Sequence, residues 1–202
     1  MRLPVFTAAT TLLLSLSLNA SDLTLKDRFD YGDPLNTAAE SLQTLNTNKH
    51  FLVANSASLG VYKYEEDEIS RILNIRPSTF TDTKALGPIH QVVVDEQSGN
   101  IFVLYSDYVQ AFKLIDLDST PALELIAHTT IPRMSIIDAD VRSDTIAILD
   151  KNGHIHSVSL ADKQFTEVQT RVEQPYIDTY QPQSIAIDDT GAIALGNKCS
   201  LE

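Results

Sequence analysis

The stretch "PQSIAIDDTGAIALGN", from Pro182 to Asn197, decides the fold, because an earlier stretch follows the same pattern. From Pro88 the chain reads "PIHQVVVDEQSGNIFVLY". In both stretches a proline precedes a β-branched strand that ends at an aspartate, and a glycine-containing turn leads into a second apolar strand. Period-two alternation and β-branched residues favour strands over helices. The repetition indicates a repeat architecture.

The repeating unit has four strands. Further strand pairs begin at His50, with "HFLVANSASLGVYKY", and at Thr145, with "TIAILDKNGHIHSVSL". Each complete unit adds an outgoing fourth strand: "ISRILNI", "LELIAHTTI" and "FTEVQTRV". Four short antiparallel strands in about 45 residues are typical of a β-propeller blade. Incoming strands end at Asp95, Asp140 and Asp188, which we interpret as turn residues that accept hydrogen bonds from their own turn backbone.

These phrases resemble the blade phrase of the YVTN, NHL and WD40-like β-propeller repeat superfamily, of the bacterial periplasmic type. The resemblance covers roughly residues 38–202, without the Trp-Asp mark of true WD40 repeats. It implies an all-β propeller with about 3.5 four-stranded blades, as a fragment of a longer ring of about seven. The expected blades are 38–80, 88–131, 132–175 and an incomplete 182–202.

The N-terminus has the pattern of an export signal. Arg2 precedes an apolar, hydroxyl-rich stretch from Val5 to Leu18, and "LNA" before Ser21 is a small-residue cleavage site. We assign 1–20 as a signal peptide and 21–37 as a linker or ring-closing strand. The expected location is the periplasm, with secretion or an uncleaved N-terminal anchor as the alternatives.

Charge and cysteine content narrow the class of partner. Removal of residues 1–20 leaves 14 basic against 27 acidic residues, a formal charge of −13. Such a field repels nucleic acid and anionic lipid, and it attracts basic proteins such as electron-transfer or respiratory proteins. Cys199 is the only cysteine, so no internal disulfide is expected. We expect protein partners, no nucleic acid and no stable membrane span after signal cleavage.

No group of residues in the sequence forms a complete catalytic or metal-binding motif. His154 and His156 lie two apart on a predicted strand, so both face one side, but no third ligand is evident. The acidic run from Glu65 to Glu68 lacks calcium-loop spacing, and Cys199 has no histidine partner in sequence. We therefore assign no catalytic residue, no metal ligand and no cofactor.

The residues that follow the blade-initial prolines are the best candidates for a binding site. In the superfamily that the chain resembles, these loops line the mouth of the central channel. The residues differ between blades: His90 and Gln91, Arg133 and Met134, and Gln183 and Ser184. Varied polar side chains around one axis give a symmetric scaffold an asymmetric surface. We take His90, Arg133 and Gln183 as the partner-binding positions.

Two functions agree with these features. The first is an exported binding or scaffold module for protein–protein interaction, accessory to a periplasmic respiratory system of the nitrate-reductase type. The second is a propeller enzyme, lactonase-like or quinoprotein-like, whose ligands lie in blades outside this sequence. The absence of Trp and of a ligand set in the sequence favours the first.

Export has a direct test. If residues 1–20 are cleaved, the mature chain begins at Ser21, because "LNA" supplies the small residues that signal peptidase requires. Mass spectrometry of the protein fractionated from its host measures the terminus. A chain that retains Met1 would contradict cleavage.

Overall fold

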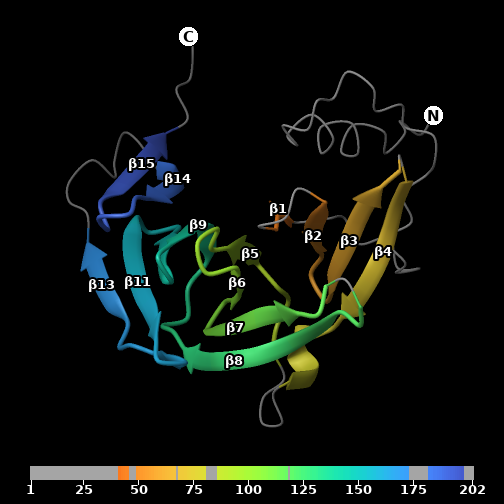
Figure 1. Cartoon of the computed structure of the whole chain (residues 1–202). Coiled ribbons are helices and arrows are strands. Elements are labelled where there is room, and N and C mark those ends of the chain that lie inside the picture. Colours follow the sequence, from red (N-terminus) through yellow and green to blue (C-terminus); the bar gives the residue numbers. More distant parts are fainter. Residues whose placement is uncertain are drawn as a thin grey trace, which may run out of the picture.

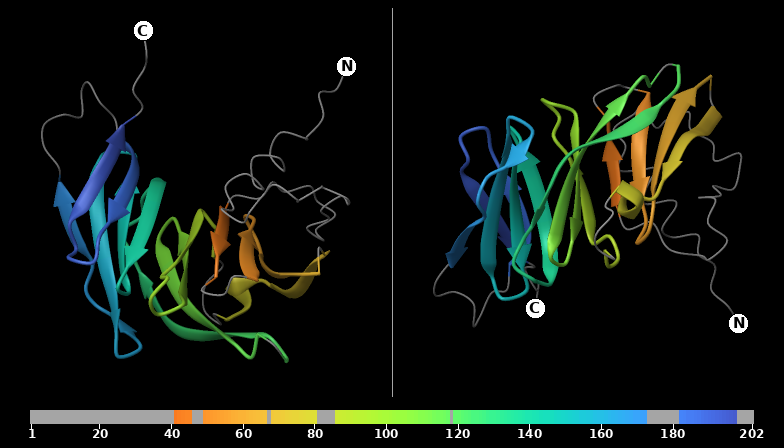
Figure 2. Two further views of the ribbon diagram at one scale, coloured as in Figure 1. Left: turned by 45° about the horizontal axis from the view of Figure 1, so that its top comes forward. Right: turned by 90° about the horizontal axis from the view of Figure 1, so that it is seen from below.

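The computed structural model describes residues 41–45, 49–66, 68–80, 86–117, 119–172 and 182–197. These residues form four antiparallel sheets that stand side by side along an arc (Figures 1 and 2). The expected signal peptide, the 21–37 segment and Cys199 lie outside the described residues. No helix among the described residues has the length and apolar character that a membrane crossing requires.

Each sheet is one blade, and the first two have four strands in sequential order. Blade 1 holds β1 (Ser41–Thr44), β2 (His50–Ala54), β3 (Leu59–Glu65) and β4 (Glu68–Ile75), followed by the 3-10 helix η2 (Pro77–Phe80). Blade 2 holds β5 (Gln91–Val94), β6 (Asn100–Tyr105), β7 (Tyr108–Ile115) and β8 (Ala122–Thr130). The predicted four-stranded unit is confirmed by these two sheets.

Blade 3 holds β9 (Ile136–Arg142), β10 (Thr145–Asp150), β11 (His154–Ala161), β12 (Gln164–Phe165) and β13 (Gln169–Val172), and blade 4 holds β14 (Pro182–Ile187) and β15 (Ile193–Asn197). The prediction of one continuous strand in "FTEVQTRV" is wrong. Here β12 pairs with one end of β11 and β13 with the other. Between β12 and β13, Thr166 forms two hydrogen bonds with Ser159 of β11. Its backbone N–H donates to the Ser159 carbonyl, and its hydroxyl accepts from the Ser159 N–H.

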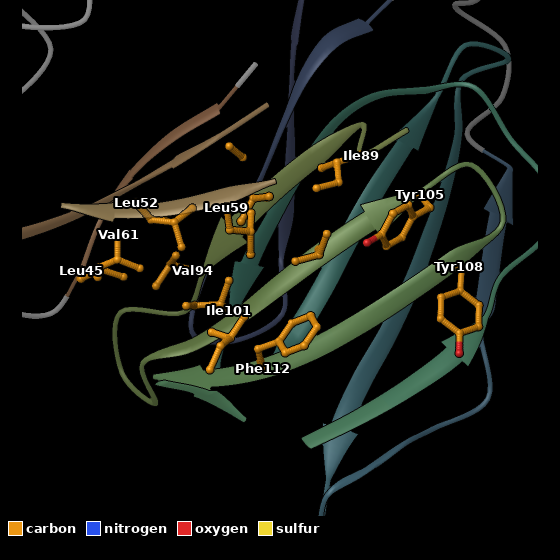
Figure 3. Packing of buried hydrophobic residues seen from close by; sticks show 14 residues of the cluster. Leu45, Leu52, Leu59, Val61, Ile89, Val94, Ile101, Tyr105, Tyr108 and Phe112 are labelled. Atoms are coloured by element: carbon orange, nitrogen blue, oxygen red, sulfur yellow. The ribbon is translucent and has the colours of Figure 1, made fainter. Parts of the chain in front are cut away.

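The second strand of each complete blade is buried on both faces. Every residue of β6 is buried. Ile101 and Val103 pack with blade 1 side chains in one cluster, whereas the alternate residues Phe102 and Leu104 pack with blade 3 in another. Figure 3 shows the first cluster, in which blade 1 side chains such as Leu52 lie beside those of β6 and β7. The blades therefore share their cores.

Inner strands of adjacent blades are joined by polar side chains. Oδ2 of Asp138 accepts the Ile185 N–H and Oδ2 of Asp140 accepts the Ile187 N–H, both at 2.9 Å. The two carboxylates lie on β9, whereas the two amides lie on the edge of β14. The interpretation of Asp140 as a turn residue is wrong, because β9 continues to Arg142 and its carboxylate bonds the next blade instead.

The shared core predicts that a single truncation inside it is costly. Ile148 in β10 is fully buried, whereas Ile137 in β9 is 42% exposed. Ile148→Ala is expected to lower the free energy of unfolding by about 2–5 kcal/mol, because it leaves a cavity between blades 2 and 3. The matched Ile137→Ala variant is expected to cost about 1 kcal/mol or less. Denaturant unfolding measures both, and equal losses would contradict this packing.

Candidate functional site: the two faces of the arc and a histidine–aspartate cluster

The antiparallel order places the turns on two opposite faces. On one face, which we call the mouth face, the chain enters the inner strands and turns from the second to the third strand of each complete blade. Its described residues are 55–58, 76–80, 86–90, 106–107, 131–135 and 151–153. We call rear face the one formed by the turns after the inner strands and after the third strands. Each of the three complete blades thus contributes described loops to both faces.

Backbone hydrogen bonds fix the mouth face. The Ile89 N–H donates to the Ser56 carbonyl at 2.8 Å, which ties the loop into blade 2 to a turn of blade 1. The Met134 N–H donates to the Ser106 carbonyl at 2.8 Å, between blades 2 and 3. The Lys151 N–H donates to the Ser135 carbonyl at 2.9 Å. These bonds hold the loops in place while their exposed side chains remain directed to solvent.

The structure places the three predicted binding positions at or beside this face. His90 directly precedes β5, and Arg133 lies between β8 and β9. The prediction that Gln183 lies in a loop is wrong. Gln183 is the second residue of β14, at the point where the register between β14 and β15 shifts. All three side chains are exposed, and none makes a side-chain hydrogen bond or ion pair with another described residue.

Two neighbouring candidates are unavailable to a partner. Met134 is buried in the core between blades 2 and 3. The Gln91 amide donates to Asp138 Oδ1 at 2.9 Å and to the Ala139 carbonyl at 3.0 Å, so it joins blade 2 to blade 3. Sequence position after a proline therefore does not by itself identify an exposed side chain.

Side chains on the rear face bond across the blades. Ser98 and Asn100 of blade 2 donate to Asp144 Oδ1 at 2.6 and 2.9 Å. Gln97 donates to Asp189 of blade 4 at 3.2 Å, and Arg142 of blade 3 forms an ion pair with the same carboxylate. The hydrogen bond from Arg142 lowers the pKa of Asp189. These polar groups of the turns after the inner strands are thus already used within the protein.

Acidic residues gather on the rear face. Its described turns carry eight acids against the two bases Lys49 and Lys163; the acids are Glu66, Asp95, Glu96, Asp116, Asp144, Asp162, Asp188 and Asp189. The described mouth-face segments carry the basic or neutral groups Arg76, His90, Arg133 and Lys151, with Asp107 as an acid. The excess negative charge of the chain is therefore unevenly distributed between the two faces.

Turn aspartates share one arrangement. Asp95 Oδ1 accepts the Gln97 N–H at 2.8 Å, and Asp188 Oδ1 accepts the Thr190 N–H at 2.8 Å. The interpretation of these two residues as turn formers is confirmed. Gly99 and Gly191 follow with φ of 71° and 80°, a region that glycine adopts without a Cβ clash.

A third aspartate brings together the two histidines that the sequence singled out. Asp150 ends β10 on the mouth side and is buried. Its Oδ2 lies 3.4 Å from His154 Nδ1 and 3.5 Å from His156 Nε2. Sequence reasoning missed Asp150, although the repeated Asp–Gly turn, here "DKNGH", was a signal that the chain reverses there.

Known structures identify the fold. The WD40 domain of SCAP from fission yeast matches 79% of this chain and 37% of its own, with a TM-score of 0.54 and 14% sequence identity. Apo AztD from Citrobacter koseri matches 75% of this chain and 39% of its own, with a TM-score of 0.50 and 14% identity. The chain thus spans under two fifths of either protein. No protein-family model and no curated protein sequence matches.

These matches confirm the predicted fold class. The chain is an all-β protein with the β-propeller fold. At this level of identity the likeness concerns the fold alone.

The Asp188 turn gives a pH prediction. The Thr190 hydroxyl, followed by the Ala192 and Thr190 N–H groups, holds the pKa of Asp188 below its ordinary value. Because the folded pKa is the lower one, this carboxylate stabilises the fold above the unfolded pKa of about 4. The contribution is lost as pH falls through the folded pKa.

The wild type is therefore expected to have a higher Tm than Asp188→Ala at pH 7, and the gap is expected to narrow as pH falls below about 4. Thermal unfolding from pH 7 to pH 3 measures the gap. A gap that stays constant over this range would show that the ionised carboxylate is not the stabilising species.

Proposed function

We propose that this β-propeller is a binding module that docks a protein partner on its mouth face. The observation that carries the proposal is the contrast between the faces. On the rear face, polar groups of the turns after the inner strands bond one another across blades, whereas His90, Arg133 and Gln183 are exposed and make no side-chain bond within the described chain. Unused donors and acceptors on loops held by a rigid scaffold are what a partner requires.

Arg133 is the central residue of this surface in our proposal. A guanidinium offers five donors in a fixed fork, and arginine is enriched among residues that dominate binding energy. The backbone around it is held by the Met134 N–H bond to Ser106 and by burial of Met134. The side chain is thus presented from a fixed backbone, which lowers the entropy lost on binding.

We further propose that the module acts in the periplasm, as an accessory to a respiratory system of the nitrate-reductase type. The export pattern of residues 1–20 and the single cysteine support the compartment. The acidic rear face supports the respiratory setting, since it complements a basic electron-transfer protein. Fractionation of the host, followed by identification of co-purified proteins, tests both the compartment and the setting.

The mouth face is tested with a partner that co-purifies from the periplasmic fraction. Arg133→Ala is expected to weaken its binding by about 1–2 kcal/mol or more, with little change in folding. The matched control is Arg171→Ala, an exposed arginine on the outer strand β13, which is expected to leave affinity unchanged. Titration calorimetry and circular dichroism measure affinity and folding separately.

A triple His90, Arg133 and Gln183 alanine variant completes the test. Unchanged affinity in a folded triple variant would exclude the mouth face. If affinity then falls on neutralising rear-face acids such as Glu66, the partner binds the acidic face instead.

A further inference from the structure

Three metal-ligating side chains meet at one turn of blade 3. Asp150 Oδ2 lies 3.4 Å from His154 Nδ1 and 3.5 Å from His156 Nε2, and the three ligand atoms lie within 4.8 Å of one another. In a tetrahedral zinc site, ligand atoms about 2.0–2.2 Å from the metal are separated by about 3.4 Å. The two distances from the carboxylate oxygen therefore have the length of tetrahedral edges.

A hydrogen bond to Thr170 can orient the His156 ring and fix its tautomer. Its Nδ1 lies 3.0 Å from the Thr170 hydroxyl of β13. If Nδ1 donates to that oxygen, the proton is held there and Nε2 carries a free lone pair. Nε2 is buried and has no hydrogen-bond partner among the described residues. A buried polar nitrogen without a partner is costly, and a bound cation would remove that cost.

The two oxygens of the Asp150 carboxylate have different partners. Oδ1 accepts the Asn152 N–H at 2.8 Å and the His154 N–H at 2.9 Å, which fixes the turn. Oδ2 faces the imidazoles, with the Asn152 amide as a further donor at 3.3 Å. Burial opposes ionisation of this carboxyl, but the His154 and Asn152 N–H groups outweigh it, so its pKa lies below the ordinary value.

We propose that Asp150, His154 and His156 form a zinc-binding site. Two imidazoles and one carboxylate are donors that Zn²⁺ takes in sites with three protein ligands. Such a set leaves a fourth position for water or another donor, and the His154 side chain, 35% exposed, lies at the solvent side of the cluster. Asp150 and Thr170 hold the ligands in place from the turn and from β13.

The same atoms also lie at ion-pair distance. His154 Nδ1 and His156 Nε2 lie 3.4 and 3.5 Å from Asp150 Oδ2, so a protonated histidine would pair with this carboxylate. These separations are longer than the about 2.7–3.2 Å of an ordinary N–H···O hydrogen bond and match those of two ligands on one zinc ion. The zinc titration distinguishes the two arrangements.

The test uses the full chain after treatment with a chelator, with Zn²⁺ alone as the probe. Titration calorimetry is expected to show one equivalent of Zn²⁺ bound, with a rise in Tm because the metal binds the folded state. Co²⁺ in place of Zn²⁺ is expected to give the intense visible bands of a tetrahedral site. Partner binding enters neither measurement, so the result is independent of the proposed function.

Variants assign the ligands. Loss of a residue that only supports a ligand lowers metal affinity by about 10–100-fold. His154→Gln and His156→Gln each remove a ligand, so each is expected to lower zinc affinity by more than this. Thr170→Val, which removes only such a supporting residue, is expected to fall within the range of about 10–100-fold. His154 and Thr170 are partly or fully exposed, so their variants keep the test valid if His156→Gln fails to fold.

The control is His128→Gln, an exposed histidine of β8 outside this cluster, which is expected to bind zinc as the wild type does. Two results would overturn the proposal. One is a folded wild type that takes up no stoichiometric zinc. The other is zinc binding that survives in the His154→Gln variant with a weak, octahedral Co²⁺ spectrum, which would indicate carboxylates elsewhere.

Discussion

The burial of the second strand of each complete blade on both faces is the constraint on which the rest of the structure depends. In β10, Ile146 and Ile148 pack toward blade 2, while Ala147 and Leu149 pack toward blade 4. A sheet with apolar residues on both faces needs a neighbour on each side, so the blades stabilise one another rather than folding as separate units. Stacking in this way leaves strand ends, turns and parts of the outer strands β4 and β8 exposed, so binding residues are expected among those segments.

The sequence predicts the repeat and its strands well because these are local properties. Alternation, β-branched runs and an Asp–Gly turn are recognised within about ten residues of sequence. Contacts between blades could not be predicted in this way. Asp140 looked like a turn residue because it ends an apolar run, yet its partner is the N–H of Ile187, far along the chain. Met134 looked exposed after a proline, yet it enters the core.

The candidate zinc site could also be predicted only in part from the sequence, although its residues lie close together in the chain. His154 and His156 were identifiable from their spacing on a strand, whereas Asp150 belongs to the preceding strand. Whether it approaches the imidazoles depends on how tightly the hairpin closes. Gly153, with φ of 78°, lets the turn reverse within a few residues, and the Gly153 N–H donates to the Asp150 carbonyl at 3.0 Å. Only this closure brings the carboxylate opposite the return strand.

Aspartates that cap a turn have different roles on the two faces. At Asp95, one carboxylate oxygen caps its own turn and the other accepts the Asp144 N–H of blade 3, so the residue joins two blades. At Asp150, one oxygen likewise caps the turn, but the other faces two histidines. At Asp95 the second oxygen joins two blades, whereas at Asp150 it faces the histidines and the Asn152 amide. A turn that needs only the first oxygen of its aspartate can therefore become a binding site through a change in what the second oxygen meets.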